Sequence, residues 1–122
     1  MTKLKPPKIY PLGDRGLCID WGNSIDPILH DQVLALHARL REAQWPAVLD
    51  LIPAYSSLTI LWNASELFQK NPDLSPYEQL CKQIAPYLAA AAHTLAPQGR
   101  LIEIPVCYAP EFAPDVAELA AT

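Results

Sequence analysis

Residues 48–62 read Val-Leu-Asp-Leu-Ile-Pro-Ala-Tyr-Ser-Ser-Leu-Thr-Ile-Leu-Trp, and this stretch predicts the centre of the fold. Two apolar runs flank a short segment with a proline, which has no backbone N–H, and two serines, which can hydrogen-bond a turning backbone. In the second run Leu58, Ile60 and Trp62 fall on one face, the period-2 pattern of a strand that is covered on one side. The stretch therefore predicts a β-hairpin at the centre of a sheet, with helices across one face.

The first run of this hairpin alternates less regularly than the second. Asp50 lies between Val48 and Ile52 on the same face, so Leu49 and Leu51 must also find cover. This need for cover on both sides is a second reason to expect the hairpin in the middle of the sheet.

An earlier hairpin is predicted over residues 9–21. Its two runs are separated by Gly13-Asp14-Arg15-Gly16, in which the glycines can adopt the positive φ of a tight turn. After the turn Leu17, Ile19 and Trp21 alternate toward one face. Because Pro11 cannot donate a ladder hydrogen bond, we expect the first strand at an edge of the sheet.

Asp26 and Pro27 predict the start of a first helix, with the aspartate as N-cap and the proline at the first helical position. The apolar residues that follow form one stripe: Leu29, Val33, Leu36 and Leu40. A helix over roughly 27–43 is therefore expected to pack on the sheet through this stripe.

A second helix is predicted to begin at Ser75-Pro76-Tyr77-Glu78, because a serine cap, a proline at N1 and a glutamate at N3 have the spacing of a capping box. We expect a kink at Pro86 and an end near residues 96–99. The mixed segment over residues 63–74 is predicted to be a loop.

Residues 101–108 predict one more strand, and residues 115–121 predict the opening of a further helix. We therefore expect an α+β fold over residues 1–99, followed over residues 100–122 by the start of another domain. The first part is predicted to be a two-layer sandwich of β-β-α-β-β-α order, with an antiparallel sheet and two helices on one face. The unpaired edge of the terminal strand predicts self-association or partner binding through it.

Composition narrows the classes of partner. The chain has 122 residues, of which 51% are hydrophobic and 18% charged, as is typical of a globular domain. The net charge of -4 offers no basic surface for nucleic acid, and no apolar run reaches the ~20 residues that span a bilayer. Neither nucleic acid nor a membrane is expected as a partner, and a cytoplasmic location is expected.

The sequence predicts no cofactor or disulfide for this chain. Cys18, Cys81 and Cys107 contain no Cys-x-x-Cys pair, so they are expected to be reduced thiols rather than zinc ligands. The four glycines form no phosphate-binding loop, so ATP binding by this chain alone is not expected.

Few polar residues are candidates for a site. Asp14 and Arg15 are either a contact for an anion or substrate, or an ion pair that fixes their turn, and the second interpretation is favoured because such surface pairs are common. His30 and His37 lie seven residues apart, about 10 Å along a helix axis, which is too far to share a metal. With His93 remote in sequence, we predict solvated histidines and no metal site.

Four short motifs, in this order, resemble one known family. They are Tyr10-Pro-Leu-Gly-Asp-Arg-Gly16, Ile25-Asp-Pro27, Ile52-Pro-Ala-Tyr-Ser-Ser-Leu58 and Glu103-Ile-Pro-Val-Cys-Tyr108. Over almost its whole length the chain resembles the B subunit of 5-oxoprolinase. That family is also named allophanate hydrolase subunit 1 and KipI, an inhibitor of a sporulation histidine kinase.

The resemblance implies an amino-terminal α/β domain, followed by a cyclophilin-like β domain that begins near Glu103. It also implies a complex that cleaves 5-oxo-L-proline to L-glutamate with ATP hydrolysis, in which the chain acts with the C and A subunits of 5-oxoprolinase. On this basis we expect a non-catalytic domain that is inactive alone. Two alternatives remain: an inhibitor domain that binds a histidine kinase, and part of an allophanate hydrolase.

The same resemblance places four residues at a partner or domain junction: Glu103, Cys107, Tyr108 and Glu111. Family members continue with Gly-Gly-Glu-Phe-Gly-Pro-Asp, whereas residues 109–115 read Ala-Pro-Glu-Phe-Ala-Pro-Asp. Since positive φ is strained for alanine and forbidden for proline, this loop has diverged or the second domain has decayed. A catalytic Cys107 would need a histidine base that the sequence does not locate.

Overall fold

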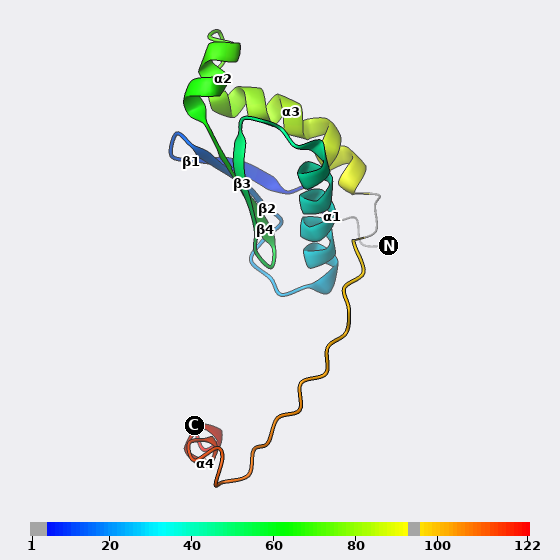
Figure 1. The fold of residues 1–122 in the computed structure, drawn as a ribbon, viewed down its shortest axis with the longest axis vertical. Coiled ribbons are helices and arrows are strands. Elements are labelled where there is room, and N and C mark those ends of the chain that lie inside the picture. The colour runs from blue at the N-terminus through cyan, green and yellow to red at the C-terminus, as the bar shows by residue number, and fades with distance from the viewer. Residues whose placement is uncertain (1–4, 93–95) are drawn as a thin grey trace.

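The computed structural model describes residues 5–92 and 96–122. Its centre is a four-stranded antiparallel sheet of order β1-β2-β4-β3 with helices on one face (Figure 1). The strands are β1 (Lys8–Leu12), β2 (Gly16–Asp20), β3 (Val48–Pro53) and β4 (Ser57–Trp62). The helices are α1 (Pro27–Ala43), α2 (Ala64–Lys70), α3 (Pro76–Ala91) and α4 (Val116–Ala120). The predicted α+β sandwich is confirmed, with α2 as an additional helix.

The first hairpin forms as its glycines predict. Gly13 has a φ of 62°, which a residue with a side chain rarely adopts. β1 pairs only with β2 among the strands, so Pro11 lies in an edge strand as expected. Leu17 and Ile19 of β2 are fully buried.

The prediction that the whole second hairpin is central is wrong. β4 lies between β2 and β3, whereas β3 is the other edge strand. The register of β3 on β4 shifts between Val48 and Asp50, so the strand contains an irregularity where its alternation fails. Leu49 lies in that irregularity and stays 66% exposed, without the predicted cover. β2 takes the central place beside β4 because its Leu17 and Ile19 need full burial.

α1 begins and ends at the predicted residues. The Asp26 carboxylate accepts a hydrogen bond from the Ile28 N–H at 2.9 Å, which satisfies one of the donors that a helix start leaves without a partner. The helix ends where Gln44 adopts the left-handed conformation, with a φ of 46°. Val33 and Leu36 of the predicted stripe are fully buried.

α2 replaces a predicted loop, and the correction has a local and a tertiary cause. Asn63 caps the helix by accepting from the Glu66 N–H at 3.3 Å, while Leu67 is buried in the core. From α3, the side-chain amide of Gln79 lies 2.8 Å from the Leu67 carbonyl oxygen and 2.9 Å from that of Asn71. A residue twelve positions away thus satisfies carbonyls at the end of this short helix.

α3 carries the predicted capping box. The Ser75 hydroxyl accepts from the Glu78 N–H at 3.2 Å, and the Glu78 carboxylate accepts from the Ser75 N–H at 2.9 Å. The helix continues through Pro86 and ends at Ala91, before the predicted residues 96–99.

The core lies between the helices and one face of the sheet. β2 and β4 supply Leu17, Ile19, Leu58, Ile60 and Trp62, and the helices supply Val33, Leu36, Leu40, Leu67, Leu80, Ile84 and Ala91. α1 contacts β3, β4 and α3, and α2 contacts α3. We call this packed unit, residues 8–92, the body.

Residues 101–108 do not form the predicted strand. They contain no strand pairing and run away from the body as an extended segment that leads to α4 (Figure 1). A strand exists only where a neighbour pairs with its N–H and C=O groups, and nothing in the described part of the chain takes that place. Its large apolar side chains are 62–87% exposed: Leu101, Ile102, Ile104, Val106 and Tyr108. We call residues 101–108 the apolar tail.

Candidate functional site

The face of the sheet opposite the helices is apolar along its middle. Because side chains alternate along a strand, the residues next to the buried ones point to this second face. The strand register joins Tyr10, Cys18, Thr59 and Ile52 in one row across the four strands, and Leu12, Gly16, Leu61 and Asp50 in the next. We call these two rows the open sheet face.

The open sheet face is only partly covered. Tyr10, Leu12 and Ile52 are 40%, 45% and 44% exposed. A Cβ added at Gly16 would lie 3.1 Å from the Leu61 Cδ2, so the leucine side chain fills the space above this glycine. The result is a smooth apolar strip with large side chains at both edges, a surface suited to packing rather than to chemistry.

Tyr10 also illustrates why this surface does not favour acid–base work. A side-chain hydrogen bond with Cys18, followed by the charge of that thiol and then by burial, raises the pKa of the Tyr10 hydroxyl. The phenol therefore remains neutral at physiological pH and acts through its ring and its hydroxyl dipole.

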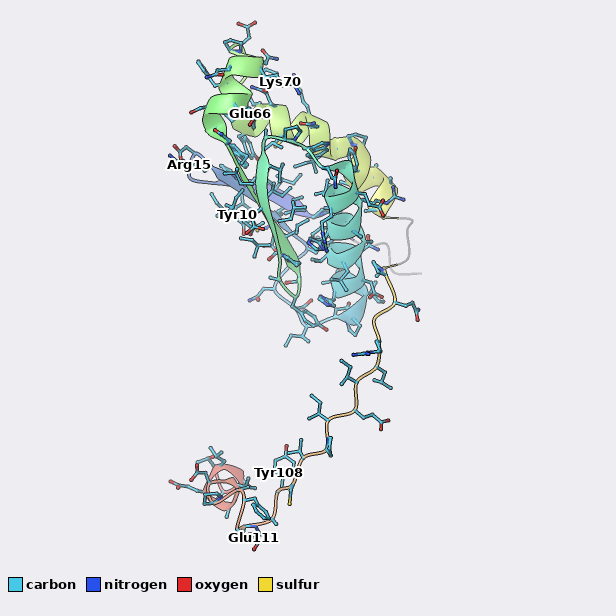
Figure 2. The ribbon with its side chains drawn as sticks, in the orientation of Figure 1. Tyr10, Arg15, Glu66, Lys70, Tyr108 and Glu111 are labelled. Atoms are coloured by element: carbon cyan, nitrogen blue, oxygen red, sulfur yellow. The ribbon has the colours of Figure 1, made fainter. Side chains whose placement is uncertain are left out.

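Asp14 and Arg15 do not form the predicted ion pair. Both side chains are exposed, and within the described residues the structure shows no ion pair between them. The turn is held by Gly13 and by a backbone hydrogen bond of 2.9 Å, which the Trp62 N–H donates to the Arg15 carbonyl. Arg15 projects at the outer end of the β1–β2 hairpin (Figure 2), which leaves its guanidinium available for an anion or a partner.

The predicted junction residues stand apart from this turn. Glu103, Cys107, Tyr108 and Glu111 are all exposed. Figure 2 shows Tyr108 and Glu111 far from Arg15, along the segment that leaves the body. Cys107 is a free thiol. The structure therefore does not assemble these residues with Asp14 and Arg15 into one site.

A polar cleft that the sequence did not indicate lies between the end of α1 and β3. Its volume is about 490 Å³, and its polar lining is His37, Arg41, Gln44 and Asp50. Partial burial, and then the positive charge of Arg41, lower the pKa of His37, so the imidazole is neutral at physiological pH. The Asp50 carboxylate accepts from the Leu51 N–H at 2.8 Å. The cleft could hold a small polar molecule, and the break at Gln44-Trp45-Pro46 was its sole sequence signal.

The histidines of the body have separate roles. The ring of His30 stacks on that of Tyr55 at 4.8 Å, and its Nδ1 lies 3.0 Å from the Tyr55 carbonyl oxygen, so it fixes the β3–β4 turn against α1. His93 lies outside the described residues. Over the ranges 5–92 and 96–122, no group of three or more His, Cys, Asp or Glu side chains could hold a metal ion.

No helix in the described ranges has the length and apolar character that crossing a membrane requires.

Comparison with known families and proteins gives one match over nearly the whole chain. The family described as "Carboxyltransferase domain, subdomain C and D" matches residues 7–122. The chain is 34% identical over 115 residues to the B subunit of 5-oxoprolinase from Bacillus subtilis (strain 168). This alignment covers 93% of the chain and 48% of that protein, so the chain spans about half the length of this relative.

Two solved structures share the fold. The N-terminal domain of the histidine kinase inhibitor KipI from Bacillus subtilis superposes with a TM-score of 0.63 at 26% identity, over 75% of this chain and 93% of that one. A conserved uncharacterized protein from Pyrococcus horikoshii superposes with a TM-score of 0.58 at 24% identity, over 69% of this chain and 35% of that one. The similarity to the Pyrococcus protein concerns the fold alone.

Proposed function

The chain belongs to the family of the carboxyltransferase domain, subdomain C and D, and on that ground we propose that it is a non-catalytic, partner-binding domain of an ATP-dependent 5-oxoprolinase. The observation that carries the proposal is the 34% identity to the B subunit of 5-oxoprolinase over 93% of the chain. In this role the chain binds homologues of the C and A subunits, and the assembled complex converts 5-oxo-L-proline to L-glutamate with ATP.

The surface of the body supports a binding role. Its most extended exposed feature is the apolar open sheet face, and exposed apolar patches of this kind commonly mark protein–protein contacts. The polar candidates, by contrast, are scattered over the β1–β2 turn, the α1–β3 cleft and the segment after residue 100. Catalysis needs groups held within hydrogen-bond reach of one another, so this arrangement favours docking over chemistry.

We also propose the domain boundary expected from the sequence, with one domain over residues 1–99 and the start of a cyclophilin-like β domain over residues 100–122. The packed body ends before this boundary, and the apolar residues beyond it lack cover. The free cysteines fit a reducing compartment, and we propose a cytoplasmic location.

Co-expression tests the proposal. The chain is produced with a homologue of the C subunit, and the mixture is analysed by size-exclusion chromatography with mass detection. We expect a stable complex, and once the A subunit is added we expect ATP-dependent release of glutamate from 5-oxo-L-proline. The same assay with allophanate, the substrate of the alternative amidohydrolase, is expected to give no product.

Two results would overturn the proposal. If the chain alone cleaved 5-oxo-L-proline, it would be an enzyme rather than a docking domain. If the chain and the C subunit formed no complex at high micromolar concentrations of both proteins, the proposed role in 5-oxoprolinase would be wrong.

A kinase-inhibitory domain is the second candidate, because the chain covers 93% of the KipI N-terminal domain in the structural superposition. A pull-down against the dimerisation domains of histidine kinases, together with an autophosphorylation assay, separates this candidate from the first. Binding without inhibition, or no binding, rejects it.

A further inference from the structure

Two apolar surfaces of this chain lack cover, and they lie on separate parts of it. One is the open sheet face, with Tyr10, Leu12 and Ile52 exposed by 40–45%. The other is the apolar tail, whose large apolar side chains are 62–87% exposed. Burying such surface is favourable by roughly 25 cal/mol per Å², so both surfaces favour association.

The two edges of the sheet are poor acceptors for an added strand. At one edge Pro11 lacks an N–H, and the Tyr77 hydroxyl donates to the Ile9 carbonyl at 3.4 Å. At the other edge β3 has an irregular register at Asp50, whose carboxylate already accepts from the Leu51 N–H at 2.8 Å. Prolines, bulges and charges at edges are devices that prevent strand addition. Docking on this sheet is therefore expected on its open face rather than at its edges.

We propose that two copies of the chain associate by reciprocal exchange, with the apolar tail of each lying across the open sheet face of the other. The tail is extended and projects clear of its own body, so it is placed to reach a second molecule (Figure 1). In an extended chain Ile102, Ile104 and Val106 lie on the same side and can face one apolar surface together. The exchange is a two-fold arrangement, which closes after two copies.

The size of the surfaces favours exchange over packing of one sheet on another. Four strands spaced by about 4.8 Å, each about five residues long at about 3.3 Å per residue, present a face of only roughly 300 Å². Two such faces packed together would bury about 600 Å², which is below the ~1,000 Å² of a specific interface. Two reciprocal contacts, each burying a face and a tail, total on the order of 1,200 Å² and exceed that limit.

Paired variants of the full chain test the exchange by analytical ultracentrifugation. Ile52→Asp introduces a charge on the open sheet face, and Ile104→Asp introduces one on the tail, where it cannot disturb the body. Each is expected to weaken self-association at least about tenfold. Phe68→Asp on α2 is the matched control, because Phe68 is also exposed, by 56%, but lies outside both surfaces. It is expected to leave self-association unchanged.

Mixing the two variants distinguishes exchange from other dimers. An Ile104→Asp copy keeps an intact face and an Ile52→Asp copy keeps an intact tail, so one of the two contacts can still form between them. With ¹⁵N-labelled Ile104→Asp chain and unlabelled Ile52→Asp chain, we expect amide shifts over β2 and β4 of the labelled molecule. Swapping the label should move the shifts to residues 101–108.

Several results would overturn the exchange. They are a full chain that remains monomeric at 500 µM, self-association that survives Ile104→Asp, and a mixture that produces no shifts in the face. If Ile52→Asp unfolded the body, Leu12→Asp on the opposite edge of the same face would replace it, and retained association of that variant would also reject the proposal.

Discussion

The body and the apolar tail contain the same kinds of residue in opposite environments. In the body Leu58 and Ile60 of β4 are fully buried, whereas in the tail Ile104 is 76% and Leu101 is 87% exposed. Both segments alternate apolar residues and both predict strands. They differ in their neighbours, because β4 has β2 and β3 on its two sides and the tail has no partner strand in the described part of the chain. An apolar pattern therefore specifies the ability to form a strand, and pairing decides whether one forms.

Alanine at matched isoleucines gives the largest expected contrast. Ile60→Ala removes a fully buried side chain and should lower the free energy of unfolding by about 2–5 kcal/mol. Ile104→Ala should change it by less than about 0.5 kcal/mol, because that residue is outside the packed core. Urea denaturation at a protein concentration too low for self-association measures both. A large loss for Ile104→Ala would mean that the tail is part of the folded unit.

The helix caps provide a smaller contrast of the same type. Asp26→Ala should cost about 1 kcal/mol, because its carboxylate holds the Ile28 N–H at the start of α1. Asp115 occupies the corresponding position of α4 but makes no side-chain cap hydrogen bond. Asp115→Ala should therefore leave the denaturation midpoint unchanged. Equal losses for the two variants would contradict the division into a packed body and an independent tail.

Acid should weaken the body through Glu78. Hydrogen bonds from the Ser75 backbone, and then from its hydroxyl, lower the pKa of the Glu78 carboxyl below its usual 4.5. A carboxyl whose pKa is depressed by folding stabilises the protein above its unfolded value, and this contribution disappears as the pH falls through the folded value. Stability should therefore decline below about pH 4.5.

Glu78→Gln should make that decline shallower, as measured by denaturation midpoints between pH 6 and 3. Glu118 lies three residues after Asp115, the same spacing at the start of α4, and Glu118→Gln is the control. It should leave the pH dependence unaltered. A wild-type decline that persisted fully in Glu78→Gln would assign it to other carboxyls.

The smallest expected effect follows deletion of the whole segment from residue 100 onward. Since the core contains no residue of that segment, the free energy of unfolding should change by less than about 0.5 kcal/mol. The shortened chain should also be monomeric, because the proposed exchange requires the tail. Loss of folding would reject the proposed domain boundary.

Local signals predicted much of the body correctly. Asp26 and Pro27 indicated the start of α1, and Ser75 and Glu78 indicated that of α3, because a cap needs only residues within one helical turn. α2 was missed although Asn63 and Glu66 carry a cap signal. Its end is completed by Gln79 of another helix, and such a contact leaves no local pattern.

The candidate site was less accessible to sequence reasoning. The turn at Asp14 and Arg15 was predicted from its glycines, but the ion pair was not found, because close sequence neighbours need not place their side chains together. The open sheet face joins residues 10–18 with residues 52–61, and only the register between β2 and β4 brings them into one row. The cleft beside Asp50 likewise depends on how α1 approaches β3.

The sequence by itself determined the family, the fold class and the positions of the capped helices, since these depend on short motifs and on periodicity within single elements. The tertiary structure alone decided that β4 and not β3 is central, that one face of the sheet stays open and that residues 101–108 remain unpaired. These features depend on which distant segments compete for the same neighbour. Hydrogen bonding and burial settle that competition over the whole chain, so no single stretch of sequence contains the answer.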